Sequence, residues 1–547
     1  MFQLTASKSP ALRSLLTAQP MGIRTFTSTS HRNYLSSMRR APYLAAAVSG
    51  VILALTYVAV PKTSTVVLAD NGSRSFSSSA GPNSQQQLKQ QITLLSDTQE
   101  NAKLRRNEES YSVNRNNGVL RYDISQLPSN NPIEDDRSEQ IVEVPIQNPE
   151  TGKLEMADWA FWGVYDGHSG WYTSAKLRDE LIGCVVTELS SVYKVSETEP
   201  KARVVPSSEE IDQAIKKGFL KLDNEIIYGN VTNALEHADD KPKAAEFLMP
   251  GLSGSCGLLS FYDSTTQILK VAVTGDSRAL LGSLNEKNQW TVKSLSIDQT
   301  GSNQEEADRI RSEHPGEPNA VTRGRVLGRL EPSRAFGDGK FKWGAELQKK
   351  IHKQFFSYPP PGNLKTPPYV TAEPVVTTTK INPSRNDFLV LGTDGLFELL
   401  TNEEIAGLVI KWAEKRKIFK DHTSSMLSSF NVFKDDKSLG FPKVIDITEN
   451  KAALKPPYRE NTLSEKKLII EDENVSTHLV RNALTLGTGD RNYGKMLLNI
   501  PSPLSRRYRD DLTVVVVFFG ENGQVDETSQ LKINLEATRG GEVKAKL

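Results

Sequence analysis

The hydrophobic pattern of this chain consists of short apolar runs, most of which stop at a turn-forming residue. From Ala160 onward, runs of apolar and β-branched residues are closed by Gly, Asp or Asn, which is typical of buried strands. They cover residues 160–166, 255–263, 268–276, 387–394 and 512–519. Only residues 264–267 separate the second run from the third. Because so short a connection cannot make a parallel crossover, we expect largely antiparallel sheets.

Apolar residues at helical spacing occupy the stretches between these runs. Ser207 and Glu210 are placed as a capping box, and behind them one face of a predicted helix carries Ile211, Ile215, Phe219, Leu222 and Ile226. A second helix is predicted after Gly170 and a third from Thr401. The expected fold class is α+β, with helices packed on the outer faces of the sheets. The polar, aperiodic residues 423–466 are interpreted as an insertion.

The first 107 residues follow neither pattern. Residues 1–40 are rich in Ser, Thr and Arg and contain no acidic residue, which is the composition of a mitochondrial presequence, with a disordered basic tail as the alternative. Residues 41–61 carry no charge. The apolar stretch from Tyr43 to Val60 would make a helix of about 27 Å, close to the roughly 30 Å hydrocarbon core of a membrane, so we predict a transmembrane segment. Residues 62–107, rich in Ser and Gln, are predicted to form a flexible linker.

These signals predict a mitochondrial location. Arg39 and Arg40 precede the apolar stretch, so a span arrested in the inner membrane would leave the bulk of the chain facing the intermembrane space. Complete import followed by cleavage would place it in the matrix instead. Residues 526–547 are expected to be a C-terminal tail, and the final Ala545, Lys546 and Leu547 resemble a peroxisomal address that would support a second pool.

The overall charge is nearly balanced, with 67 Lys and Arg residues against 66 Asp and Glu residues. Seven of the basic residues lie among the first 69 positions, where there is no acidic residue, so the remainder is net acidic. That distribution argues against nucleic acid as a partner. Cys184 and Cys256 are too few for a disulfide framework or a zinc module, and we expect them to be small buried hydrophobes.

Acidic residues stand at the ends of several predicted strands. The set consists of Asp166 with Gly167 and His168 behind it, Asp276, Asp394, Asp510 with Asp511, and Glu134-Asp135-Asp136 at the start of the domain. An Asp-Gly pair by itself usually marks a turn. Carboxylates that converge on one rim, however, cannot all stay ionised without cations between them, and oxygen ligands favour hard divalent ions over zinc. A glycine at position 167 would let a backbone carbonyl approach such an ion.

Six stretches occur in the following order along the chain: FWGVYDGHSG, LSGSCGLLSF, VAVTGDSRALLG, SRAFGD, DFLVLGTDGLFELLTNEE and YRDDLTVVVVFF. Together they resemble the metal-dependent protein phosphatase (PPM, type 2C) family over residues 107–520. Within that family, the stretches SNNPIEDDRSE, RVLGRLEPSRAFGDGKFKW and THLVRNAL are most similar to the mitochondrial pyruvate dehydrogenase phosphatases.

The resemblance implies a catalytic domain at residues 108–525, folded as two packed antiparallel β-sheets flanked by helices, an αββα sandwich. It also implies Mg²⁺ or Mn²⁺ as the cofactor. Asp166 would bridge two ions, and the carbonyl of Gly167 would complete one of them. Asp394 and Asp510 would hold one ion, while Glu134 would hold the other through water that Asp135 steadies. Asp276 would join Asp394 at a weaker third site.

The implied reaction is hydrolysis of phosphoserine or phosphothreonine. A water shared by the ions would lose a proton and attack phosphorus as hydroxide. His168, two residues beyond Asp166, would protonate the leaving oxygen as general acid, although a lone His is often structural. The family commonly has an Arg that grips the substrate phosphate where this chain has Asn130, and Arg137 and Arg334 are candidate replacements.

We therefore expect a protein serine/threonine phosphatase that acts on a phosphoprotein, with the E1 alpha subunit of pyruvate dehydrogenase as the expected substrate. An inactive homologue that serves as a binding module is one alternative, and a hydrolase of small phosphoesters is another. The expected location contains a conflict. Pyruvate dehydrogenase is a matrix enzyme, whereas an arrested span would put the phosphatase domain across the inner membrane.

Overall fold

The computed structural model describes residues 25–26, 94–113, 118–355, 357–419, 442–458 and 468–520. The predicted apolar span at 41–61 and the predicted tail at 526–547 lie outside these ranges, as does all of the predicted presequence except residues 25–26. In the part of the chain that is described, no helix has both the length and the apolar character needed to cross a membrane.

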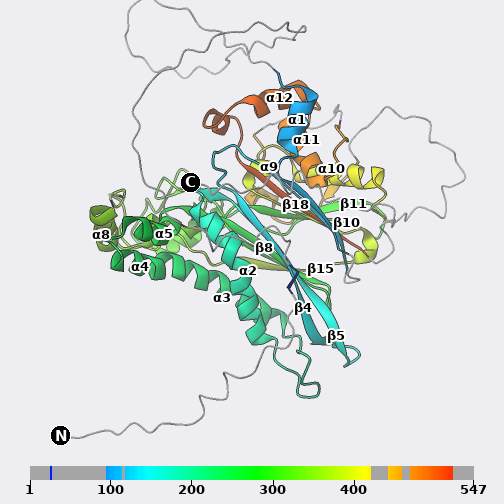
Figure 1. The fold of residues 1–547 in the computed structure, drawn as a ribbon, viewed down its shortest axis with the longest axis horizontal. Helices are drawn as coiled ribbons and strands as arrows, with labels where there is room; N and C mark the ends of the chain where they lie inside the picture. Colours follow the sequence, from blue (N-terminus) through cyan, green and yellow to red (C-terminus); the bar gives the residue numbers. More distant parts are fainter. Residues whose placement is uncertain are drawn as a thin grey trace, which may run out of the picture.

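Two β-sheets form the centre of the fold (Figure 1). The six-stranded sheet has the order β1 (Thr25–Phe26), β4 (Asp136–Gln147), β5 (Leu154–Tyr165), β8 (Gly257–Asp263), β9 (Ile268–Thr274), β15 (Val375–Lys380). The seven-stranded sheet has the order β17 (Ile445–Asp446), β11 (Trp290–Ser294), β10 (Arg278–Leu284), β16 (Phe388–Gly392), β18 (Leu512–Phe519), β3 (Val119–Leu127), β2 (Glu108–Ser112). Apart from the parallel pair of β11 and β17, these neighbours are antiparallel. The antiparallel prediction is confirmed.

The two sheets pack face to face on a core of large apolar side chains. Trp162, Leu258 and Val271 of the six-stranded sheet meet Ile124 and Val515 of the seven-stranded sheet in one buried cluster. Each of these side chains alternates along its strand with one that points to the outer face, because successive residues of a strand face opposite ways. The outer faces are apolar as well, so each of them needs a covering layer of helices.

Helices supply those covering layers on both sides of the paired sheets (Figure 1). α2 (Tyr172–Val192) and α3 (Ser208–Asn224) bury apolar faces against the six-stranded sheet. α10 (Asn402–Lys415) and α11 (Val475–Leu484) do the same on the seven-stranded sheet. The capping box of Ser207 and Glu210 forms as predicted. The fold is therefore the expected αββα sandwich.

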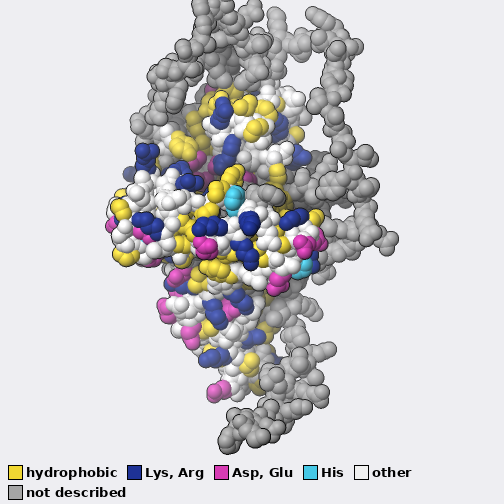
Figure 2. Space-filling view, turned by 90° about the vertical axis from the view of Figure 1, so that its left-hand side faces the viewer, with side chains coloured by type: hydrophobic (Ala, Val, Ile, Leu, Met, Phe, Trp, Pro, Cys, Tyr) yellow, Lys and Arg dark blue, Asp and Glu magenta, His cyan; other side chains and the backbone are white. Residues whose placement is uncertain are grey.

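Shorter elements close the ends of the sandwich. A π-helical turn, Glu225–Gly229, connects α3 to the following helix. The remaining helices are α4 (Asn230–Glu236), α5 (Lys241–Leu252), α6 (Gln304–Glu313), α7 (Gly339–Lys342), α8 (Ala345–Phe355), α9 (Asp394–Phe397) and α12 (Arg491–Asn499). The short strands are β6 (Gly167–His168), β7 (Gly254–Ser255), β12 (Val321–Thr322), β13 (Arg325–Val326) and β14 (Phe336–Gly337). Figure 2 shows Lys and Arg side chains interspersed with acidic and apolar ones on the side of the molecule that carries α4, α5 and α8.

Part of the segment expected as a linker is a helix, α1 (Asp97–Leu104). Ser96 and Gln99 form a capping box at its start. The buried carboxylate of Glu100 then accepts a hydrogen bond of 2.9 Å from Arg481 of α11. Because a buried charge needs a partner, this ion pair ties α1 to the domain. The polar composition of the segment hid the helix, since α1 is held by charge more than by apolar packing.

The segment expected as an insertion is partly anchored to the sandwich. Residues 442–458 are described, and within them β17 extends the seven-stranded sheet and a 3-10 turn covers Lys451–Ala453. The backbone N–H of Lys455 donates to Asp298, and its carbonyl accepts from Arg278. This part of the insertion therefore has a fixed place beside the loops that follow β9 and β11.

Candidate metal centre

The topology brings the acidic strand ends to one edge of the sandwich. β5 and β9 run in the same direction, since both are antiparallel to β8 between them, so Asp166 and Asp276 emerge at the same edge. In the other sheet, Asp394 follows the end of β16 where the antiparallel β18 begins. Carboxylate oxygens of Asp166, Asp276 and Asp394 lie within 4.8 Å of one another. The structure thus assembles three of the predicted ligands.

Asp510 lies close enough to this trio to influence it. Burial raises the pKa of Asp166 well above its usual value, and the charges of Asp394, Asp135 and Asp510 raise it further. The pKa of Asp394 is raised by burial and then by Asp276 and Asp510. Like charges at short range oppose ionisation of one another. In the absence of a cation, these carboxylates would hold protons.

Asp135 and Glu134 occupy the start of β4 at the same edge. The carboxylate of Asp135 is buried and accepts hydrogen bonds from the hydroxyls of Thr393 (2.9 Å) and Thr513 (2.8 Å). Glu134 accepts the backbone N–H of Gly170 at 2.6 Å. Burial raises the pKa of Glu134, whereas that hydrogen bond lowers it. Both side chains therefore have fixed positions beside the trio.

Asp511, beside the predicted ligand Asp510, organises this corner. Its carboxylate accepts the backbone N–H groups of Asn130 and Glu134, both at 2.9 Å. The side-chain amide of Asn130 donates to Asp511 and to Glu134, at 3.1 and 3.2 Å. Asn130 thus holds the Glu134 side chain in place. Sequence reasoning missed this role of Asp511, although the Asp-Asp pair before β18 was a visible signal.

Gly167 is required by close packing. A Cβ atom at this position would lie 2.1 Å from the carbonyl oxygen of Glu134 and 2.8 Å from the hydroxyl of Ser174. The absence of a side chain lets β6 approach the Glu134 segment, so that the residues after Asp166 and the residues before β4 meet. This steric requirement adds to the predicted reason for a glycine, the approach of its carbonyl to an ion.

His168 forms an ion pair with a residue to which sequence reasoning gave no role. Its Nε2 lies 2.6 Å from the carboxylate of Asp338. Burial by itself lowers the pKa of His168, but the charge and hydrogen bond of Asp338 raise it above the usual value. Asp338 is buried, yet His168 holds its pKa below the usual value. The pair therefore favours a protonated imidazolium. Asp338 is the last residue of the stretch SRAFGD.

Two basic side chains reach the acidic residues. Arg506, on the 3-10 turn Leu504–Arg507, forms an ion pair with Asp510, and 40% of its side chain is exposed. Lys455 places its Nζ 3.6 Å from a carboxylate oxygen of Asp394. Neither was predicted. Arg506 lies just before the stretch YRDD, and Lys455 lies in the segment expected as an insertion, so both are outside the motifs.

The two replacements suggested for the missing phosphate-binding Arg are engaged elsewhere. Arg137 pairs with Glu139 and Glu109 at 2.7 and 2.6 Å. Arg334 pairs with Glu306 at 2.7 Å. Each guanidinium already has carboxylate partners of its own, so the suggestion that Arg137 or Arg334 grips the phosphate is not supported by these contacts.

The donor set fits hard divalent cations. The ligands within reach of one another are carboxylates, which Mg²⁺ and Mn²⁺ prefer. The nearby thiol of Cys256 donates to Asp276 at 3.1 Å. Burial and the charges of Asp276 and Asp166 raise the pKa of this thiol well above its usual value. A thiol that stays protonated is a poor metal ligand, so Cys256 does not give the site a preference for zinc.

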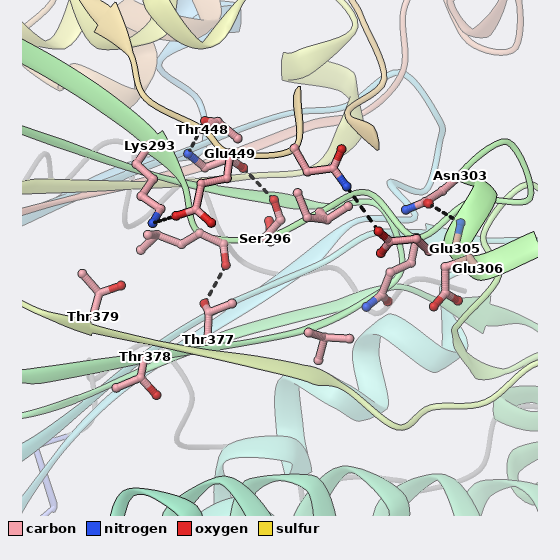
Figure 3. Close-up of a pocket in the computed structure, with 16 residues that line it drawn as sticks. Lys293, Ser296, Asn303, Glu305, Glu306, Thr377, Thr378, Thr379, Thr448 and Glu449 are labelled. Atoms are coloured by element: carbon pink, nitrogen blue, oxygen red, sulfur yellow. Dashed lines mark hydrogen bonds and ion pairs between the residues drawn. The ribbon is translucent and has the colours of Figure 1, made fainter. Parts of the chain in front are cut away.

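The structure also contains a cavity of about 480 Å³ (Figure 3). It is lined by residues of β11, β15, α6 and the 448–450 segment. Gln299 lines the cavity and accepts the backbone N–H of Gly275 at 2.7 Å. In Figure 3, Lys293 points toward Glu449, with which it forms an ion pair of 3.0 Å. None of the predicted metal ligands lines this cavity.

Comparison with known proteins agrees with this geometry. Residues 135–434 match the family Protein phosphatase 2C. The chain is 43% identical to the mitochondrial [pyruvate dehydrogenase [acetyl-transferring]]-phosphatase 1 of Saccharomyces cerevisiae, over 93% of each chain. It is 38% identical to a protein phosphatase 2C homolog of Schizosaccharomyces pombe, over 77% of this chain and 84% of the other. Its identity to the human mitochondrial [pyruvate dehydrogenase [acetyl-transferring]]-phosphatase 1 is 28%, over 78% of this chain and 84% of the other.

Because the carboxylates are crowded, we predict an unusual pH dependence of the free energy of unfolding when a chelator keeps the protein free of metal. Burial raises the pKa of Asp276 to about 6, above its value in the unfolded chain. The folded protein therefore binds more protons, and this contribution to stability is lost as the pH rises through 6. Between pH 5 and 7.5 in chelator, we expect the free energy of unfolding to fall by about 1.4 kcal/mol on account of this residue, because the rest of the loss occurs below pH 5. Urea denaturation at each pH measures it.

D276N should flatten that fall, and Mn²⁺ should abolish it in the wild-type protein because cations replace the protons. D308N is the matched control, since Asp308 is exposed on α6 and its pKa is lowered. A slope that is the same in the wild-type protein and D276N would contradict the expected titration.

Proposed function

Because the chain belongs to the protein phosphatase 2C family and is a metal-dependent protein serine/threonine phosphatase similar to the pyruvate dehydrogenase phosphatases, we propose that it dephosphorylates the E1 component of pyruvate dehydrogenase in mitochondria. The observation that carries the chemistry is the meeting of Asp166, Asp276 and Asp394 within 4.8 Å. The substrate proposal is supported by relatives named for this activity, one of which matches 93% of the chain.

Different acidic residues would bind each of two ions. Bound Mg²⁺ or Mn²⁺ supplies a water of lowered pKa as nucleophile and positive charge for the phosphate. Asp166 would contribute to holding both ions, since it is surrounded by the charges of Asp394, Asp135 and Asp510. Asp394 and Asp510 would hold one ion and Glu134 the other. Asp135, held by two threonine hydroxyls, would support the side of Glu134.

His168 is suited to protonate the leaving serine oxygen. Asp338 occupies Nε2 of the imidazole, which leaves Nδ1–H as the donor toward the substrate. Because Asp338 raises the pKa of His168, the ring keeps its proton to a higher pH than a free imidazole would. An alkoxide leaving group is a strong base, so a positioned acid contributes substantially to its departure. This pair supports the predicted general-acid role over a purely structural one.

Arg506 is suited to bind the substrate phosphate. Its guanidinium reaches Asp510 from the solvent side, and 40% of the side chain is exposed. An ion that binds Asp510 competes for the carboxylate, which leaves the planar guanidinium beside the site where phosphate arrives. Arginine binds phosphate oxygens with paired hydrogen bonds. Arg506 thus supplies the charge that Asn130 lacks.

The sequence alternatives can be weighed against these residues. An inactive homologue would be expected to lack part of the metal-binding set, whereas Glu134, Asp166, Asp276, Asp394 and Asp510 are all acidic here. A mitochondrial location is supported both by the composition of residues 1–40 and by the names of the relatives. The span between Tyr43 and Val60 and the peroxisomal pool remain predictions.

D394N tests the catalytic proposal. Loss of this ligand should reduce kcat/KM toward a phosphoserine peptide of E1 at least about 100-fold, since several kcal/mol of transition-state stabilisation depend on the ions. Phosphate release measures activity, and circular dichroism checks the fold. D308N should match the wild-type protein. Full activity in D394N, or activity that survives strong chelation, would refute the metal mechanism.

The same assay separates the proposed substrate from the small phosphoesters. The wild-type protein should have a higher kcat/KM for phosphorylated E1 than for phosphometabolites. The reverse preference would favour a small-phosphoester hydrolase and would leave the metal mechanism standing.

H168Q tests the general acid through the leaving group. We expect kcat toward phosphoserine to fall by roughly 100- to 10,000-fold. Toward p-nitrophenyl phosphate the fall should be much smaller, because nitrophenolate leaves without protonation. D338N should move the alkaline limb of the phosphoserine pH–rate profile to lower pH, since Asp338 raises the pKa of His168. Equal losses on both substrates would point to a structural role for His168.

R506Q tests the phosphate contact. A charged hydrogen bond contributes about 1.5–3 kcal/mol, so KM and the inhibition constant of inorganic phosphate should both rise by roughly 10- to 100-fold. R506K should recover part of the loss. R507Q is the matched control, because the neighbouring Arg507 is exposed. Unchanged phosphate inhibition in R506Q would exclude the contact.

A further inference from the structure

We infer that the ammonium group of Lys455 occupies the position of a third cation at the acidic cluster, so that this chain binds two divalent ions there and not three. Lys455 comes from the segment expected as an insertion, not from the motifs of the phosphatase domain. The inference rests on the proposed two-ion function and concerns the acidic side chains that those two ions do not need.

The ammonium lies among carboxylates in the way that a cation would. Nζ of Lys455 is 2.9 Å from Glu331, 2.9 Å from Glu398 and 3.6 Å from Asp394. Asp394 and Glu398 stand one helical turn apart on and just after α9, and Glu331 comes from the loop before β14. Three acidic groups from two separate parts of the fold therefore share one positive charge.

Asp276 lies next to this charge. Its carboxylate is within 4.8 Å of the carboxylate of Asp394, which Nζ of Lys455 approaches to 3.6 Å. Asp276 and Asp394 are the two residues expected to hold a weaker third ion. The ammonium thus faces the acidic side chains that such an ion would use. A divalent ion needs its oxygen ligands at about 2.0–2.6 Å, so it could not enter among them without displacing Lys455.

The backbone around Lys455 holds the side chain in this position. The N–H of Lys455 donates to Asp298 at 2.7 Å, and its carbonyl accepts from Arg278 at 3.0 Å. Arg278 and Asp298 are buried and paired with each other. Three residues further along, after Pro456 and Pro457, the N–H of Tyr458 donates to the carbonyl of Glu398 at 2.9 Å. The segment is clamped on both sides of the lysine, which is unlike a freely moving surface lysine.

The same contacts argue against a role for Lys455 in binding phosphate. An ammonium has three N–H donors, and three carboxylates surround this one. Glu331 and Glu398 each lie 2.9 Å from Nζ, so the ammonium is already paired within the acidic cluster. Only 24% of the side chain is exposed, compared with 40% for Arg506. Lys455 neutralises the site, and Arg506 faces the incoming substrate.

Calorimetric titration of the full chain with Mn²⁺ tests the inference without any activity assay. The wild-type protein should bind two ions. K455M should bind a third, weaker ion, because Glu331 and Glu398 then lose their positive partner and Asp276 and Asp394 can share an added ion. K455R keeps the charge and should bind two. K451M is the matched control, since Lys451 lies in the same segment, is half-exposed and pairs with Asp446.

Three ions in the wild-type protein would overturn the inference, as would two ions in K455M with unchanged affinity. If K455M unfolds in chelator and is restored by Mn²⁺, the result supports the inference, since an added ion then replaces the lost ammonium. If K455M does not fold even with Mn²⁺, the wild-type stoichiometry decides. A wild-type protein that binds no Mn²⁺ would instead refute the proposed two-ion function.

Discussion

Repulsion among buried carboxylates is the constraint on which the rest of this structure depends. Asp166, Asp276 and Asp394 emerge from two different sheets within 4.8 Å of one another. Burial raises the pKa of each, and neighbouring carboxylates of the cluster raise the pKa of Asp166 and Asp394 further. An uncompensated buried charge costs several kcal/mol. The core of the sandwich is formed by the interdigitating apolar faces of both sheets. This packing fixes the positions of the strand ends even though the acidic side chains there repel one another.

The groups around the cluster compensate for that repulsion. Divalent ions would satisfy the centre in the proposed function, Lys455 neutralises the Asp394 side, and Arg506 approaches Asp510 from solvent. Asp511 is used differently, because its carboxylate accepts backbone N–H groups of the 129–134 loop and so becomes a structural anchor. The His168–Asp338 pair is neutral as a whole. It can therefore sit beside the anionic cluster while keeping a proton available.

Periodic features of the sequence predicted the framework of this fold. The strand runs, the antiparallel order and the capping box of α3 follow from local spacing, and the acidic residues at strand ends followed from the same pattern. What escaped prediction depends on partners distant in the chain. The structural role of Glu100 depends on its ion pair with Arg481. The role of Lys455 depends on its ion pairs with Glu331 and Glu398. Asp338 likewise needed His168, because SRAFGD alone does not say what its carboxylate holds.

The thiol of Cys256, hydrogen-bonded to Asp276, has a consequence for how the enzyme tolerates oxidants. Peroxide attacks thiolates, and a thiol whose pKa is raised by burial and neighbouring anions rarely ionises. The proposed reaction takes its nucleophile from solvent and needs no thiolate. We therefore expect slow oxidation of Cys256 as the consequence of its place beside Asp276.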